Sequence, residues 1–228
     1  MSILIVVAHP DDEVLGCGGT AAAFASQGEK VFSCILSGDA DARNDRPELS
    51  DFHSNISQAQ KILGYQEPIL GGFPNIRFNA VPHLELVQFI ESSIVQAQAE
   101  VIFTHHPNDI NDDHKQTSAA CQAAARLFQR RPGIIALRGL YFMEILSATD
   151  WTFPSTDAFR ADTFYEIGGE LLDKKIEALR SYKGVMRDFP HPRSDEILRG
   201  LAAYRGGQAG MRYAEAFQTA FHALGRTN

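Results

Sequence analysis

The sequence predicts an α/β domain built on a mainly parallel sheet with helices on both faces. Three runs rich in β-branched and aromatic residues are mostly apolar throughout instead of alternating, which is typical of strands buried on both faces. The runs are ILIVV (3–7), VFSCILS (31–37) and EVIFTH (100–105). Helical patterns separate them, and this alternation of strands and helices indicates parallel strands joined by helical crossovers.

Three helices are predicted among these strands. They cover residues 18–28, 50–64 and 82–98. Ser50 suits the N-cap of the second helix, which ends at Gly64, and Pro82 lies in the first turn of the third. The glycines of GCGG (16–19) lack the GxGxxG pattern of a dinucleotide site, so they predict close packing of a helix start against the sheet.

The second half of the chain is expected to complete and cover the same sheet. The segment IIALRGLYFMEIL (134–146) indicates one or two more strands, and a helix is predicted near residues 169–183. The stretch from residue 190 to 221 is expected to be largely helical. No repeat, low-complexity tract or linker divides the chain, so we expect residues 1–228 to form a single domain.

Charge and composition argue against several classes of protein. The net charge of −7 disfavours a nucleic-acid binder, which usually carries a basic face. No stretch reaches the roughly 20 apolar residues of a membrane span, and SILIVVA resembles a first strand more than a secretory signal. The three cysteines lack CxxC spacing, which predicts buried, reduced thiols. We therefore expect a cytoplasmic protein without a nucleic-acid partner.

Two polar clusters follow predicted strands at the point where each strand ends. HPDDE comes directly after the strand at 3–7, and HHPNDINDDH overlaps the end of the strand near 100–105. Ligands of an open parallel sheet bind beyond the carboxyl ends of its strands. Neighbouring strands would therefore bring the two clusters, about a hundred residues apart in sequence, into one crevice.

The residue types in this crevice suit a catalytic metal site. His9 and Asp12 are close enough for one turn to direct both side chains at an ion, and His114 supplies a third ligand. Two imidazoles and one carboxylate, with a position left for water, are typical of catalytic zinc. Asp11 would lie beside the ion and take the proton of the water. The alternative is a solvated acidic turn with a helix-capping aspartate.

Other histidines lie near the crevice without a defined role. His105 and His106 come at the end of the strand, where a position behind the metal ligands and a position in the core fit equally well.

The segments AHPDDEVLGCGG and HHPNDINDDH strongly resemble the LmbE/PIG-L family of zinc-dependent N-deacetylases, and LSGDADAR and RGGQAGMRYAEAF extend the resemblance over nearly the whole chain. The resemblance implies a Rossmann-like three-layer α/β sandwich in which His9, Asp12 and His114 bind Zn²⁺. It implies that Asp11 is the general base and later protonates the leaving amine. Family substrates are N-acetylated amino sugars, usually N-acetylglucosamine conjugates, and the family suggests a homo-oligomer, either a trimer or a hexamer.

The resemblance also assigns residues around the metal and reveals one departure. Arg43 matches a family position that contacts substrate. Many members carry a histidine that stabilises the oxyanion three residues before the distal ligand, whereas this chain has Asn111 there. Asparagine can donate a hydrogen bond to an oxyanion but cannot transfer a proton. Asp113, next to His114, is expected to orient a neighbouring group, as carboxylates behind metal ligands do.

His191 is a candidate for the missing donor. It lies between two prolines in FPHPRSDE, which restrict the backbone and would present its ring rigidly. The alternative is a surface turn in which the histidine has no role.

These observations predict a zinc amidohydrolase that removes an acyl group, first of all acetyl, from an amino sugar or sugar conjugate. A non-haem Fe(II) oxygenase is the first alternative, because two histidines and one carboxylate also form the facial triad of that metal. A sugar-binding or metal-sensing protein without catalytic activity is the second. Asp11 argues against it, because a binder gains little from another buried acid.

Overall fold

The computed structural model describes residues 1–38, 49–153 and 156–225 of the chain. The strands are β1 (Ser2–Val7), β2 (Lys30–Ile35), β3 (Ile69–Leu70), β4 (Val101–His105), β5 (Gly139–Met143), β6 (Thr163–Glu166) and β7 (Ala214–His222). The helices are α1 (Asp12–Ser26), α2 (Leu49–Leu63), α3 (His83–Ala97), α4 (Asp112–Ala124), α5 (Leu127–Arg130), α6 (Gly168–Ser181) and α7 (Asp195–Ala209). Single 3₁₀ turns cover Phe78–Ala80 and Thr149–Trp151.

The strands of the described residues form one mostly parallel sheet in the order β3-β2-β1-β4-β5-β7-β6. β1 is hydrogen-bonded in parallel to β2 on one side and to β4 on the other. Only β7 runs antiparallel to its neighbours, which are β5 and β6. Because the chain leaves β1 toward β2 and later returns to the other side of β1 at β4, the sheet has a topological switch point between β1 and β4.

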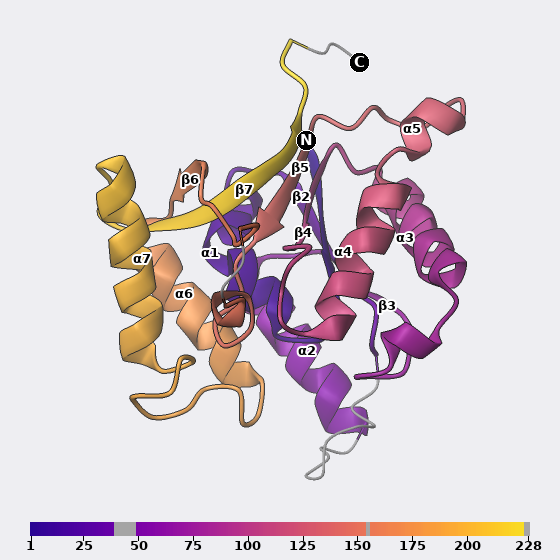
Figure 1. Cartoon of the computed structure of the whole chain (residues 1–228). Coiled ribbons are helices and arrows are strands. Elements are labelled where there is room, and N and C mark those ends of the chain that lie inside the picture. The colour runs from indigo at the N-terminus through magenta and orange to yellow at the C-terminus, as the bar shows by residue number, and fades with distance from the viewer. Residues whose placement is uncertain (39–48, 154–155, 226–228) are drawn as a thin grey trace.

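Helices cover both faces of this sheet, as the sequence predicts (Figure 1). On one face, α1, α2, α6 and α7 pack over a core that takes Ile3, Ile5 and Val7 from β1. On the other face, α3 and α4 pack over a core that takes Leu4 and Val6. Every residue of β1 is buried, which confirms that its unbroken apolar run reflects a strand with helices on both sides.

The first helix begins earlier than predicted. It starts at Asp12 instead of residue 18, and its backbone is interrupted at Cys17, where φ is −147°. The two acids at its start therefore belong to the first turn of a helix. A Cβ added to Gly16 would lie 2.7 Å from the Met143 sulfur in β5, which agrees with the predicted close packing of these glycines.

The expectation of a largely helical segment from residue 190 to 221 is wrong in its last part. α7 ends at Ala209, and Ala214–His222 forms β7. Its sequence, AEAFQTAFH, contains residues that favour helices in isolation, but pairing with β5 and β6 and burial of Phe217 decide its conformation. The short strands β3 and β6 were not predicted at all.

Among the described residues, every helix is too short or too polar to span a membrane.

Candidate active site

The site lies at the switch point of the sheet. β1 ends at Val7 and is followed at once by the turn that carries His9, whereas β4 ends at His105 and leads to the start of α4. Val6 and Thr104 are partners in the two adjacent strands, so the segments that follow them emerge side by side. The structure thus brings the two polar clusters together, as strand-end geometry predicts.

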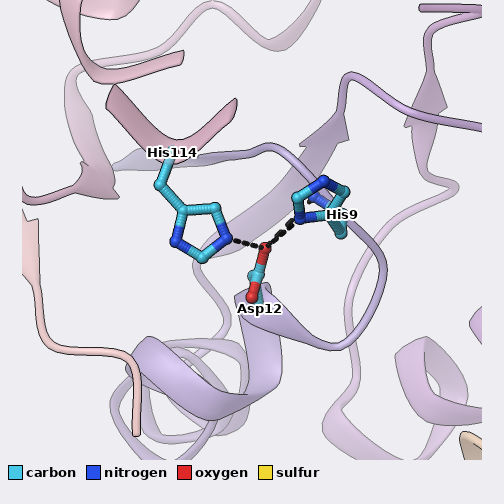
Figure 2. Close-up of side chains that lie close together, drawn as sticks. All are labelled: His9, Asp12 and His114. Carbon is cyan, nitrogen blue, oxygen red and sulfur yellow. Dashed lines mark hydrogen bonds and ion pairs between the residues drawn. The ribbon is translucent and has the colours of Figure 1, made fainter. Parts of the chain in front are cut away.

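Three buried side chains converge at this point: His9, Asp12 and His114 (Figure 2). Asp12 Oδ2 lies 3.3 Å from His9 Nδ1 and 3.1 Å from His114 Nε2, so the carboxylate sits between the two rings. One ligand atom from each residue lies within 4.8 Å of the other two. This arrangement offers two imidazole nitrogens and a carboxylate oxygen to one ion.

The remaining nitrogen of each ring faces a second carboxylate. His9 Nε2 lies 3.0 Å from Asp113 Oδ2, and His114 Nδ1 lies 3.2 Å from Asp109 Oδ2. A histidine that binds a metal usually donates its other ring N–H to such a carboxylate, which fixes its tautomer and orientation. The donor set therefore fits a divalent cation, with one nitrogen of each ring held toward Asp12.

These two outer carboxylates are fixed by further hydrogen bonds. Asp109 accepts the hydroxyl of Thr149 at 2.7 Å and the amide of Asn111 at 2.9 Å. Asp113 accepts the amides of Ile76 at 2.6 Å and Phe78 at 2.9 Å. Both carboxylates are thus oriented before any ion arrives.

The charges of the cluster also favour a cation. Burial alone would lower the pKa of His114, but the carboxylates of Asp12 and Asp109 outweigh it and raise this pKa to about 10. Burial likewise opposes the charge of Asp12, yet His114 and His9 hold its pKa well below the usual value. In the metal-free protein, a proton on His114 therefore supplies positive charge that a bound cation can replace.

A second group of possible ligands, His105, Asp109 and His114, is not a metal site. His105 Nε2 accepts the amide of Ala8 at 2.9 Å, so Nδ1 carries the ring proton and no lone pair remains for an ion. Burial, followed by the charge of His114, lowers the pKa of His105 to about 3 and keeps its ring neutral. Its ring stacks on that of His114 at 3.8 Å between centroids. His105 therefore packs against the proposed metal ligand His114 and does not bind an ion itself.

Asp11 precedes the helix in an unusual backbone conformation. Its φ is 94°, a region that non-glycine residues rarely adopt and that typically costs ~1–3 kcal/mol. The side chain is buried, and Oδ2 lies 3.2 Å from Arg193 Nη1. The amide of Asp11 donates to Glu13 Oε2 at 3.0 Å. Glu13 also accepts the Tyr182 hydroxyl, and burial raises the pKa of Glu13 to about 8.

The remaining predicted site residues, Asn111, His191 and Arg43, have different surroundings. Asn111 is the N-cap of α4, and its side-chain oxygen accepts the amide of Asp113 at 2.9 Å. His191 is partly exposed in the loop between α6 and α7, where Nδ1 accepts the amide of Arg193 at 3.0 Å. His191 is therefore two residues from a side chain that reaches Asp11. Arg43 lies outside the described residues.

Sequence reasoning missed four residues that contact this site: Asp109, Thr149, Tyr182 and Arg193. Asp109 falls inside the second polar cluster, so its position after β4 was a usable signal. The other three come from distant loops and helix ends, where no local pattern predicts a contact with Asp11, Glu13 or Asp109.

Comparison with known proteins identifies the family that the two polar clusters resemble. The family model of PIG-L, described as GlcNAc-PI de-N-acetylase, matches residues 4–125, just over half of the chain. The match confirms the resemblance carried by the two polar clusters. The matched part contains every predicted site residue except His191.

Two curated relatives are deacetylases by name. The uncharacterized deacetylase YaiS of Escherichia coli (strain K12) is 25% identical over 189 residues, which cover 79% of this chain and 90% of the relative. The 1D-myo-inositol 2-acetamido-2-deoxy-alpha-D-glucopyranoside deacetylase of Mycolicibacterium gilvum (strain PYR-GCK) is 28% identical over 156 residues. That match covers 54% of this chain and 55% of the relative.

Solved structures share the fold along its whole length. The conserved protein TT1542 from Thermus thermophilus has a TM-score of 0.78 at 25% identity, covering 98% of this chain and 96% of its own. GalB, the 4-carboxy-2-hydroxymuconate hydratase from Pseudomonas putida KT2440, has a TM-score of 0.75 at 22% identity, with full coverage of both chains. The fold is therefore found in enzymes named for more than one kind of reaction.

Proposed function

Because the chain belongs to the PIG-L family, we propose that it is a zinc-dependent hydrolase that removes an N-acetyl or other N-acyl group from an amino sugar or sugar conjugate. One observation carries the proposal: two buried imidazoles each lie between Asp12 and an outer carboxylate, and the residue before Asp12 is a further buried acid, Asp11. A ligand set held in this way suits a catalytic ion. The relatives named as deacetylases support amide hydrolysis as its use.

His9, Asp12 and His114 would hold the ion. A zinc ion there would supply Lewis-acid chemistry, because it would acidify a water molecule and polarise the amide carbonyl. Asp11 is not part of this group of ligands and is the adjacent carboxylate, so it takes the proton of the attacking water. Asp11 then returns a proton to the leaving amine nitrogen as the carbon–nitrogen bond breaks.

The negative charge that develops on the amide oxygen needs a hydrogen-bond donor. Asn111 uses its side-chain oxygen as a helix cap, which directs its amide NH₂ group away from Asp113 and leaves it to donate to the oxyanion. We assign the second donor to His191, whose Nδ1 accepts the Arg193 amide, so that its ring proton resides on Nε2 and can be donated. Arg43 is the proposed sugar contact.

Acetate release tests this function directly. The panel would contain N-acetylglucosamine and N-acetylglucosaminides with inositol, lipid or peptide aglycones, each incubated with protein before and after chelator treatment. We expect acetate and free amine in equal amounts, loss of both with chelator, and recovery with zinc.

Three outcomes would contradict the proposal. Addition of water to a substrate without amine release would indicate a hydratase. Oxygen uptake that depends on an oxo acid would indicate an Fe(II) oxygenase. Tight sugar binding without turnover by the zinc-loaded protein would indicate a binding protein.

A further inference from the structure

The positive φ of Asp11 is a strained backbone conformation, which persists only if neighbouring groups stabilise it. Among the described non-glycine residues, positive φ angles occur only at Asp11, Ile76, Gln98 and Ser147. The conformation at Asp11 separates two consecutive carboxylates: Asp11 faces Arg193, whereas Asp12 faces the rings of His9 and His114. Loss of the positive φ would turn the Asp11 carboxylate away from its present position.

Glu13 is placed to hold that conformation. Its side chain is fully buried, and Oε2 accepts the Asp11 amide at 3.0 Å across the turn. Its other carboxyl oxygen is hydrogen-bonded to the hydroxyl of Tyr182. Tyr182 is buried and follows the last residue of α6, so the turn at Asp11 is tied to a helix about 170 residues later in the chain.

We propose that Glu13, held by Tyr182, is a positioning residue for Asp11, because its carboxyl oxygen Oε2 accepts the Asp11 amide and so fixes the direction of the Asp11 side chain. The inference rests on the proposed role of Asp11 as the base. In this role Glu13 neither contacts the substrate nor exchanges a proton. It acts by keeping Asp11 in the geometry that proton transfer requires, and a displacement of about 1 Å at such a group can cost about 10²-fold in rate.

Variants at residue 13 separate this role from a proton-transfer role. Glu13→Gln keeps an oxygen that accepts the Asp11 amide and an NH₂ group that donates to the Tyr182 oxygen. Glu13→Met keeps the volume but removes the acceptor. Tyr182→Phe leaves Glu13 in place and removes only its anchor. Tyr65→Phe is a matched control, because the buried Tyr65 hydroxyl has no hydrogen-bond partner among the described residues.

We would measure kcat, KM, zinc content and melting temperature for each variant, and solve crystal structures for the φ angle at Asp11. Glu13→Met is expected to bind zinc and keep its KM, to lose about 10²-fold in kcat, and to show a negative φ at Asp11. Glu13→Gln is expected to keep the positive φ and kcat within a few-fold of the parent. Tyr182→Phe should lose about tenfold in kcat, and Tyr65→Phe should match the parent.

Two results would overturn the inference. A positive φ at Asp11 and parental kcat in Glu13→Met would show that Glu13 is not needed for positioning. A large loss of kcat in Glu13→Gln with the positive φ retained would give Glu13 a role in proton transfer instead. If Glu13→Met does not fold, Tyr182→Phe decides, and parental kcat there overturns the inference. The φ angles test it even if the parent hydrolyses no acylated sugar, which would be a failure of the proposed function alone.

Discussion

Asp109 Oδ2 lies 3.2 Å from Nδ1 of His114, the ring nitrogen that does not face Asp12. Asp109 is therefore placed to orient a proposed metal ligand without binding the ion itself. We predict that Asp109→Asn weakens zinc affinity by about 10–100-fold, as loss of such outer carboxylates usually does. Competition with a fluorescent chelator measures the affinity. Asp112→Asn, which changes an exposed acid in the first turn of α4, is the control, and equal affinities for all three proteins would contradict the prediction.

The ligand set predicts one divalent ion per chain, zinc as isolated. His114→Ala removes one of three ligands, so we expect it to lose most of the metal during dialysis. Elemental analysis gives the metal content. His106→Ala is a matched control, because the ring of His106 is hydrogen-bonded to Gln218 and is not one of the three proposed metal ligands. Full metal content and parental affinity in His114→Ala would rule out these ligands.

His191 lies in the same loop as Arg193 and accepts its amide, and two variants separate the possible roles of His191. His191→Ala is predicted to lower kcat about 10²-fold with zinc content unchanged, because the oxyanion loses a donor. His191→Asn keeps an oxygen near the position of Nδ1, which can accept the Arg193 amide, but lacks the Nε2 proton. Loss of kcat in both variants supports proton donation. Recovery in His191→Asn would show that the ring only shapes the loop.

The three cysteines should be reduced and unreactive in the folded protein. All three are buried, and burial raises the pKa of Cys34 and of Cys121 to about 12. At pH 9 only about 0.1% of such a thiol is ionised, and the thiolate is the reactive form. We predict no reaction with Ellman's reagent at pH 9 until denaturant is added, and then three thiols per chain.

The same pKa values predict a loss of stability at high pH. Above the usual cysteine pKa of 9.0, unfolded thiols release protons that the folded protein retains until about pH 12. The unfolded state then binds fewer protons than the folded state, so the free energy of unfolding falls as the pH rises above 9. Fast reaction of the native thiols at pH 9 would contradict both statements.

The central part of the fold could be predicted because its strands are buried on both faces. β1 and β4 contain runs of buried, mostly apolar residues, and β2 is mostly apolar, a pattern that no amphipathic helix would show. β7 could not be predicted, because the helix-forming residues in AEAFQTAFH become a strand only through pairing with β5 and β6. The start of α1 was missed because its first turn carries acids instead of an apolar stripe.

The site was predictable where it depends on strand ends. His9, Asp12 and His114 follow β1 and β4 closely, and the order of the sheet makes these strands neighbours. The contacts of Tyr182 and Arg193 were not predictable, because they depend on how α6 and the following loop pack over α1. The predicted trimer or hexamer, the cytoplasmic location and the substrate contact of Arg43 stay predictions.

The most direct test of the account is the kcat of Asp11→Asn at the zinc content of the parent. The substitution is nearly isosteric and removes the basicity and charge of a side chain that is not a proposed metal ligand, so metal binding should persist. A positioned general base typically contributes about 10²–10⁴-fold in rate, and we predict a loss of kcat for acetate release within that range. Comparable kcat values for Asp11→Asn and the parent, at equal zinc content, would contradict the mechanism.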